Sequence, residues 1–194
     1  MSRHAVVKRT TNETNIALSL DLDGEGAYNV ETGIGFFDHM LSHIARHGGL
    51  SLDVKAKGDL HVDEHHLVED VGICFGKALL EALGDKRGIE RFGEAFVSMD
   101  ESLARTVIDL SGRSSLVCLA EFSRESINGF PLELVREFFQ AVANEGRMNI
   151  HIALLYGTNA HHEAEAVFKS FGRALRAALK ASGGKEIPST KGVL

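Results

Sequence analysis

The sequence predicts an α+β protein built by internal duplication, in which each of two similar halves is a small, mostly antiparallel sheet of about four strands covered on one face by two helices. The pentapeptide H-H-x-x-E occurs twice, beginning at His65 and again 96 positions later at His161. The segments 13–24 and 101–112 also match, since each is a glutamate followed by an alternating strand that ends in Asp-Leu-x-Gly. Internal similarity over such a long period indicates a fold of two units.

The length and composition of the chain agree with two fused halves. The chain has 194 residues, of which 44% are hydrophobic and 25% are charged, as in an ordinary soluble globular protein. We expect a first half over residues 1–90, a second half over 91–183 and a C-terminal tail over 184–194.

Charge and cysteine content argue against several classes of protein. The net charge of −6 is unlike that of a dedicated nucleic-acid binder, although it leaves room for a local basic pocket that holds a small anion. No stretch approaches the roughly 18 uninterrupted apolar residues of a membrane span, and the start of the chain lacks the apolar core of a secretory signal. Two cysteines are too few for a disulfide framework, which fits a reducing cytoplasm. Together these observations predict a cytoplasmic protein without a membrane or nucleic-acid partner.

The first half is expected to contain three strands, a helix, a fourth strand and a second helix. Apolar and polar residues alternate from Thr14 to Leu22, which is typical of a half-buried strand, and turn residues follow from Asp21 to Gly26. A helix that carries His39 comes before the fourth strand, and the last helix begins with the first pentapeptide. The fourth strand is expected over 51–57 and the last helix over about 64–83.

The second half is expected to repeat this order. Apolar residues recur at helical spacing from Leu132 to Ala143, and Pro131 is expected to open this helix because proline favours the first helical turn. The strand that follows is expected over 148–154, and the helix with the second pentapeptide over about 161–181.

The repeated pentapeptide indicates metal binding. Imidazole and carboxylate groups are ligands of zinc, manganese and iron, and a histidine and a glutamate three or four residues apart lie on one helix face. Adjacent histidines point about 100° apart, so each motif offers ligands in two directions, which suggests two metal ions. A lone histidine at a helix start is more often a cap, but two copies at equivalent positions favour ligation. The repeat also pairs His39 with Glu137, and both are candidates for the remaining ligand of equivalent sites.

Other metal motifs fit less well. An H-E-x-x-H zinc peptidase motif would begin at His162-Glu163, but Ala166 stands where the second histidine should be. The E-x-x-H motif of ferritin-like proteins belongs to a four-helix bundle, and this chain has too many expected strands for that fold.

One helix carries a row of further histidines. His39, His43 and His47 are spaced by four residues and so share one helix face. For His43 and His47 the row is either part of a functional site or an exposed polar face.

Arginines and the tail are candidates for binding an anion. Arg91 and Arg113 lie beside glycine-bearing turns, and the planar guanidinium group suits phosphate, although either alone is more often a surface residue. The segment Ser189-Thr190-Lys191 places hydroxyls beside a lysine, so it can close over a phosphate, or else it is a frayed terminus.

Together these residues resemble the imidazoleglycerol-phosphate dehydratases of histidine biosynthesis. The match runs from about residue 3 to the end of the chain, and its motifs are specific in order and spacing. The segments that carry it are Glu13-Thr14, Phe37-Asp38-His39-Met40-Leu41, Gly58-Asp59, Asp63-Glu64-His65-His66, Glu69-Asp70, Arg91-Phe92-Gly93, Asp109-Leu110-Ser111-Gly112-Arg113, His161-His162 and Pro188-Ser189-Thr190-Lys191-Gly192. The resemblance is to the monofunctional form, without a fused phosphatase segment, and it implies halves of the ribosomal protein S5 domain 2-like type.

The resemblance implies a dehydration. D-erythro-imidazole-glycerol phosphate would lose water to give imidazole-acetol phosphate, with two Mn²⁺ ions per active site and an imidazolate intermediate. The proton that is removed lies on a carbon with no adjacent carbonyl, so electron density from the ring would expel the hydroxyl group through a diazafulvene-like species. Two metal ions that act as Lewis acids agree with two near-equivalent ligand sets.

By motif position, the resemblance assigns a role to each candidate. Glu13 would be the acid or base that moves the carbon-bound proton. The catalytic residues would be Glu13, His39, His43, His47, His65 and Glu69. The metal ligands would be His39, His65, His66, Glu69, Glu137, His161, His162 and Glu165. The phosphate would be held by Arg91, Arg113, Ser189, Thr190 and Lys191, with the tail 184–194 closing on it.

This chain departs from the family pattern at two positions, and two other functions remain as alternatives. Relatives often carry histidine in place of Glu137 and in some cases glutamine in place of His43. A metal-dependent hydrolase or phosphatase would favour clustered aspartate ligands over paired histidines. A metal-storage or structural assembly would need neither Glu13 nor the arginines.

The family assembles as 24 identical subunits built from trimers, with metal sites at subunit contacts, and the resemblance implies the same assembly here. The diverging histidines independently support metal sites at subunit contacts. Because they point apart on one helix, a single chain does not readily supply all the other ligands around both of them.

Overall fold

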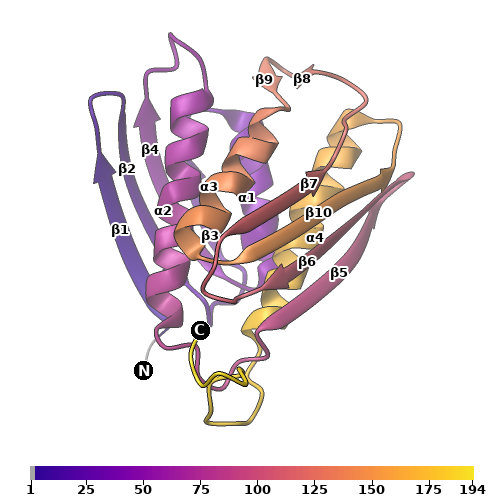
Figure 1. Ribbon diagram of the computed structural model, residues 1–194. Coiled ribbons are helices and arrows are strands. Elements are labelled where there is room, and N and C mark those ends of the chain that lie inside the picture. Colours follow the sequence, from indigo (N-terminus) through magenta and orange to yellow (C-terminus); the bar gives the residue numbers. More distant parts are fainter. Residues whose placement is uncertain (1–2) are drawn as a thin grey trace.

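Two four-stranded sheets form the outer layers of the protein, and four helices lie between them (Figure 1). This computed structural model describes residues 3–194; Met1 and Ser2, with which the predicted first half begins, lie outside the described residues. The predicted α+β class and its duplication are confirmed, since the two sheets have the same strand order and the same order of helices between the strands. No helix among residues 3–194 is long and apolar enough to cross a membrane.

The first half forms one sheet with the order β1-β2-β4-β3, in which only β3 and β4 are parallel. Its elements are β1 (His4–Thr10), β2 (Thr14–Asp21), β3 (Tyr28–Glu31), α1 (Gly35–Gly48), β4 (Ser51–Gly58) and α2 (His65–Leu83). Alternate residues of β2 are buried, as the sequence pattern predicted, because one face of the sheet packs on the helices.

The second half forms a sheet with the equivalent order β5-β6-β10-β7, in which only β7 and β10 are parallel. Its elements are β5 (Phe92–Met99), β6 (Ser102–Asp109), β7 (Ser115–Leu119), β8 (Ser126–Ile127), β9 (Phe130–Pro131), α3 (Leu134–Gly146), β10 (Asn149–Tyr156) and α4 (Ala160–Leu179). The short hairpin of β8 and β9 has no counterpart in the first half and was not predicted.

The prediction that Pro131 opens a helix is wrong. Pro131 ends β9, where it pairs with Ser126, and α3 begins three residues later at Leu134. Proline has no backbone N–H to donate, which is tolerated in a two-stranded hairpin, where one side of each strand needs no partner. The expected helix 132–143 is therefore shifted toward the C-terminus.

The helices meet around seven fully buried phenylalanines: Phe37, Phe75, Phe130, Phe138, Phe139, Phe168 and Phe171. Phe138 lies at the centre, with its ring centroid 5.5 Å from that of Phe37 on α1 and 5.8 Å from that of Phe168 on α4. Glycine lets α2 approach α3 closely, since a Cβ atom on Gly72 would lie 2.8 Å from the Phe138 carbonyl oxygen. The apolar core of both halves is thus continuous through the helix layer.

All four helices begin at the same end of the molecule, which is the upper end in Figure 1. The parallel strands β3 and β4 run toward this end, and β2 starts there, because Thr14 at its beginning pairs with Gly58 at the end of β4. The tail lies at the opposite end, below the C-terminus of α4 (Figure 1). The two pentapeptides therefore share one end of the fold.

Candidate active site

Both pentapeptides stand in the first turn of a helix, and in each case a polar side chain two residues earlier bonds to the backbone of the first histidine. Asp63 Oδ1 accepts a hydrogen bond from the backbone N–H of His65 at 2.9 Å. Asn159 Oδ1 accepts the equivalent bond from His161 at 3.0 Å. Such caps satisfy a backbone donor that has no partner within the helix. Each cap stands two residues before its pentapeptide, so equivalent sequence positions fix the histidines in the first turn of α2 and of α4.

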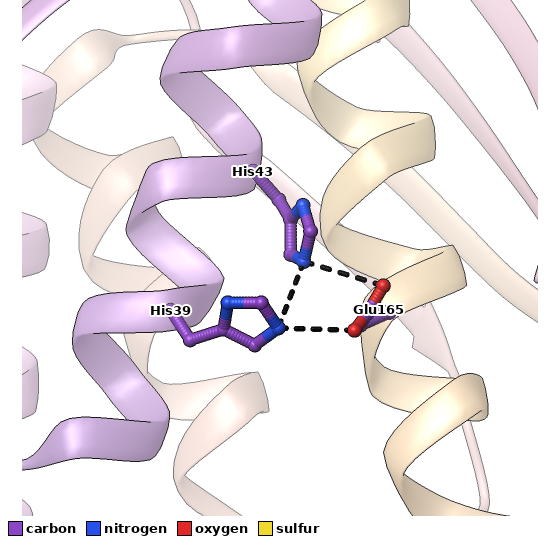
Figure 2. Close-up of side chains that lie close together, drawn as sticks. All are labelled: His39, His43 and Glu165. Carbon is purple, nitrogen blue, oxygen red and sulfur yellow. Dashed lines mark hydrogen bonds and ion pairs between the residues drawn. The ribbon is translucent and has the colours of Figure 1, made fainter.

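One cluster of metal-ligating side chains forms where α1 lies beside α4 (Figure 2). Glu165 Oε1 lies 3.0 Å from His39 Nε2 and 2.9 Å from His161 Nε2. His43 Nε2 lies 3.3 Å from the other carboxylate oxygen of Glu165 and 3.2 Å from His39 Nε2. Imidazole nitrogens that converge on a carboxylate form the mixed nitrogen and oxygen donor set that suits manganese, iron or zinc. The donor chemistry of this cluster therefore fits a metal ion.

The charge states of Glu165 and His43 suit a site that binds a metal ion. Burial alone would raise the pKa of Glu165, but hydrogen bonds from Lys169 and His39 outweigh burial and lower the pKa to about 2. Burial lowers the pKa of His43 to about 4, although the charge of Glu165 opposes this effect. At neutral pH the cluster thus holds an ionised carboxylate beside a neutral imidazole.

The predicted histidine row continues along α1. The ring centroids of His39 and His43 are 4.4 Å apart, and those of His43 and His47 are 5.7 Å apart. Burial lowers the pKa of His47, and the neighbouring cations Lys169 and Arg173 lower it further. His39 is exposed, but His43 and His47 are half-buried beside charged side chains of α4, so these two histidines do not form an exposed polar face. A cavity of about 950 Å³ opens at its end and is lined by His47 together with Arg46, Arg173 and Arg176.

A second cluster of metal-ligating groups forms at the start of β2, where Glu13, Asp59 and His66 come together. Asp59 Oδ2 lies 3.0 Å from His66 Nδ1, and Glu13 Oε2 lies 3.9 Å from the same nitrogen. This hydrogen bond with Asp59 raises the pKa of His66. The side chain of Glu13 is 54% exposed, so its carboxylate is open to an incoming molecule.

The second histidine of the other pentapeptide is held in a similar way. His162 Nδ1 lies 2.8 Å from Glu101 Oε2, while His162 Nε2 lies 3.8 Å from Asp100 Oδ2. The hydrogen bond with His162 lowers the pKa of Glu101 to about 2, and it raises the pKa of His162.

The adjacent histidines of each pentapeptide point apart. The ring planes of His65 and His66 make an angle of 87°, and those of His161 and His162 make an angle of 89°. In both pairs the ring centroids are 6.3 Å apart. Each motif does present nitrogen ligands in two directions, as the helical geometry predicted.

The structure does not bring His65, Glu69 and Glu137 together as it does their repeat counterparts. His65 is half-buried and Glu69 is exposed. The carboxylate of Glu137 lies 3.5 Å from the guanidinium group of Arg136. Within residues 3–194, the clusters of His39 and of His66 are the only groups of three such ligands within 4.8 Å. The equivalence of Glu137 with His39 thus rests on the repeat and on the packing of α2 against α3.

Arg91 lies at the other end of the molecule and is fixed by three contacts. Its Nε and Nη2 donate to the two oxygens of Asp109 at 2.7 and 3.2 Å, and Nη1 donates to the carbonyl of Pro188 at 2.8 Å. The backbone of Arg91 is left-handed, with φ of 71°, and its side chain contacts the tail at Pro188.

The tail folds onto this end of the protein and is not frayed. Leu194 lies so close to Gly112 that a Cβ atom on that glycine would be 2.6 Å from the Leu194 carbonyl carbon. Ser189 Oγ accepts a hydrogen bond from the Lys191 N–H at 3.2 Å, while Thr190 and Lys191 are exposed. Because Gly112 immediately precedes Arg113, the tail and both predicted arginines meet around one turn.

Within one chain, the candidate phosphate ligands are far from the candidate metal ligands. The backbone N–H of Arg91 donates to the carbonyl of Ala178 at 3.0 Å, near the end of α4. His161 stands in the first turn of the same helix, 17 residues earlier. At a rise of 1.5 Å per residue, these positions are about 26 Å apart along the helix.

Sequence reasoning missed several residues that shape the site. Lys169 pairs with Glu165 one turn later, and its i, i+4 spacing could have revealed it. Asp70 is buried, where it accepts hydrogen bonds from Arg9 and from Thr14, and so fixes α2 against the strand that follows Glu13. No local pattern marks such a contact between an α-helix and two strands.

The fold and the site define a duplicated α+β protein with histidine–carboxylate clusters at the common start of its helices. The family model described as Imidazoleglycerol-phosphate dehydratase matches residues 32–175. The chain therefore belongs to the imidazoleglycerol-phosphate dehydratase family, which comprises hydro-lyases of histidine biosynthesis.

Individual relatives and solved structures agree with this assignment. The chain is 55% identical to the imidazoleglycerol-phosphate dehydratase of Hydrogenovibrio crunogenus over 99% of this chain and 100% of the relative. It is 53% identical to that of Geobacillus kaustophilus over 100% of both. The Staphylococcus aureus crystal structure superposes with a TM-score of 0.84 at 43% identity, covering 92% of this chain and 99% of the other. The Pyrococcus furiosus structure does so with a TM-score of 0.85 at 37% identity, covering 97% and 100%.

Proposed function

We propose that this chain dehydrates D-erythro-imidazole-glycerol phosphate to imidazole-acetol phosphate with two Mn²⁺ ions per active site and through an imidazolate form of the substrate ring. The observation that carries this proposal is the convergence of His39, His161 and Glu165. Three side chains from two helices meet there with the donor types that a divalent transition metal needs, and the carboxylate of Glu165 is ionised.

The duplication predicts a second ligand group at the equivalent positions of the other half. The repeat counterparts of His39, His161 and Glu165 are Glu137, His65 and Glu69, and they would hold the second ion. His66 and His162 diverge from these groups, so each would reach an ion bound mainly by another chain. When bound, the ions would supply Lewis acidity that stabilises negative charge on the imidazole ring.

The groups of the chain itself would move the protons. Glu13 offers an exposed carboxylate beside the His66 cluster, so it can take the proton from the substrate carbon. His43 is neutral at neutral pH and adjoins the ligand group, so its ring can accept a hydrogen bond from the substrate. His47 would complete the row on the side of the large cavity.

The phosphate would be held by Arg91, Arg113, Ser189, Thr190 and Lys191, under the tail 184–194. The phosphorylated substrate spans roughly 10 Å at ordinary bond lengths. This is much less than the separation of about 26 Å between the two groups of candidate ligands in one chain, taken from the rise of α4. The active site would therefore join the metal-ligand end of one chain to the arginine end of another. A homo-oligomer of 24 subunits built from trimers would provide such contacts.

A turnover assay with imidazole-glycerol phosphate tests this proposal. The protein is stripped with a chelator and assayed without metal and then with added Mn²⁺ or Mg²⁺. We expect negligible turnover after chelation and recovery with Mn²⁺ only. Because the metal sites would lie at subunit contacts, chelation should also lower the particle mass measured by light scattering. Full turnover and full particle mass in a metal-free sample would contradict the proposal.

Two unpaired cysteines, Cys74 and Cys118, are compatible with the reducing cytoplasm that we propose as the location.

A further inference from the structure

Two carboxylates that are not among the proposed metal ligands each contact the second histidine of a pentapeptide through the same ring nitrogen. Asp59 contacts Nδ1 of His66 at 3.0 Å, and Glu101 contacts Nδ1 of His162 at 2.8 Å. An ionised carboxylate can only accept, so Nδ1 is the protonated donor in both rings. In each neutral ring the lone pair is then on Nε2. Asp100 is 3.8 Å from Nε2 of His162, which is too far for a hydrogen bond, so that nitrogen is free.

Glu101 is itself held in a fixed position. Its Oε1 accepts hydrogen bonds from the backbone N–H of Asn159 at 2.9 Å and from that of Thr158 at 3.3 Å. Ser102 Oγ donates to the same oxygen at 3.1 Å. One carboxylate oxygen thus anchors the loop that leads into α4, and the other oxygen contacts His162. A carboxylate with both oxygens engaged cannot easily turn, so it fixes the direction of the imidazole.

The two halves supply the carboxylate of this arrangement from different positions in the repeat. Glu13 and Glu101 occupy equivalent positions before β2 and β6, yet only Glu101 is bonded to its histidine. In the first half Asp59, which follows Gly58 at the end of β4, takes that place, and Glu13 stays 3.9 Å away. In the second half Thr158 follows Gly157, and it donates to Glu101 instead.

We propose that Asp59 and Glu101 are positioning residues that orient His66 and His162, so that Nε2 of each ring faces a metal ion, and that Asp59 thereby leaves Glu13 free for proton transfer. This inference rests on the proposed metal function. It also separates the roles of two glutamates that the duplication made equivalent: Glu101 became a support for a ligand, whereas Glu13 kept an unbound carboxylate.

The physical basis is the effect of a hydrogen bond from Nδ1 to a carboxylate on the other nitrogen of a neutral imidazole. A carboxylate that accepts from Nδ1 fixes the tautomer, holds the ring plane and makes the opposite nitrogen a better ligand. Loss of such a partner typically lowers metal affinity about 10- to 100-fold. The carboxylate raises metal affinity only through the histidine that it orients, so its effect on affinity disappears when that histidine is replaced.

A double-mutant cycle tests the positioning role directly. Glu101→Gln is made in the wild-type chain and in a His162→Ala chain, and Mn²⁺ dissociation constants are measured by electron paramagnetic resonance of the free ion. We expect Glu101→Gln to weaken binding about 10- to 100-fold in the wild type and to have almost no effect in the His162→Ala chain. Asp59→Asn with His66→Ala should behave in the same way. Glu121→Gln, an exposed carboxylate of the second half, is the matched control and should bind as the wild type does.

The outcomes separate the two proposals. If wild-type protein binds no Mn²⁺, the proposed metal function fails. If wild-type protein binds Mn²⁺ and Glu101→Gln and Asp59→Asn bind it equally well, the positioning role is refuted. Equal weakening by Glu101→Gln with and without His162 would refute it as well, because the residue would then act on the fold and not through the histidine. Circular dichroism and the melting temperature of the metal-free variants identify any loss of folding.

Discussion

His39 on α1 lies 3.0 Å from Glu165 on α4, although 126 positions separate them in the chain. The side chain of Glu165 is only 7% exposed, whereas that of His39 is 46% exposed, so the contact joins a buried carboxylate to an imidazole open at the surface. The two helices meet in this register because phenylalanines from all four helices pack at the centre of the molecule. Core packing therefore determines which histidine faces which carboxylate.

Glu13→Gln is predicted to remove turnover while leaving metal content and assembly intact. The amide keeps the shape of the side chain but cannot take or return a proton, and general acid–base catalysis contributes about 10²- to 10⁴-fold. The measurement is kcat together with manganese content by mass spectrometry and particle mass by light scattering. Loss of all three together would support a structural role for Glu13 in place of a catalytic one.

Glu137→Ala is predicted to weaken binding of one Mn²⁺ per chain by at least about tenfold, whereas Glu137→His should preserve it. The side chain is half-buried on α3 at the repeat position of His39, so a histidine there would supply the ligand type of the other half. Titration of chelated protein with Mn²⁺ measures both the affinity and the number of sites. Glu121→Ala is the control. If Glu137→Ala bound two ions as tightly as the control, Glu137 would not be a ligand.

In the metal-free protein, His43 is predicted to reduce stability as the pH falls below 6.5, in opposition to His66 and His162, whose pKa values are raised. The pKa of His43 is about 4 in the folded state against its usual 6.5, so the unfolded chain binds a proton more readily between these values. The pKa of Glu165 is about 2 against its usual 4.5, so its contribution is lost in the same direction at lower pH. One histidine can change the free energy of unfolding by up to about 1.4 kcal/mol per pH unit in its window.

The change that tests this pH dependence is His43→Gln. Urea unfolding of chelated protein at several values between pH 7 and pH 4 should show a flatter profile for the variant than for the wild type. Identical slopes would mean that His43 is not the group responsible, and His47, whose pKa is also lowered, would be the next candidate.

The sequence alone was sufficient for the fold class, and it indicated the candidate residues from which the site was built. Repetition of H-H-x-x-E and of the strand ending in Asp-Leu-x-Gly identified the two halves, because duplicated sequences keep their spacing. The repeat also singled out Glu137, whose local sequence is unremarkable for a ligand. Helical periodicity correctly placed His39, His43 and His47 on one face.

Residues that act through tertiary contacts could not be found in this way. The hydrogen bond between Glu101 and His162 joins two elements 61 positions apart, and Asp59 resembles any loop aspartate until the structure places it beside His66. The start of α3 was misplaced because Pro131 can open a helix or end a hairpin strand, and local sequence does not distinguish these cases.

The central claim is that one active site takes its metal ligands and its phosphate ligands from different chains, and mixing two inactive variants tests it most directly. Arg113→Ala removes an exposed arginine at one end of the chain, and Glu165→Gln removes a carboxylate at the other. The two proteins are mixed in equal amounts, dissociated with chelator and reassembled with Mn²⁺. If each site draws the two groups from separate chains, about one quarter of the sites regain both native residues, so the mixture should recover about a quarter of wild-type turnover. The control is Arg113→Ala mixed with a chain that carries both substitutions, which cannot form an intact site. A mixture of the two single variants that stays as inactive as this control would contradict the claim.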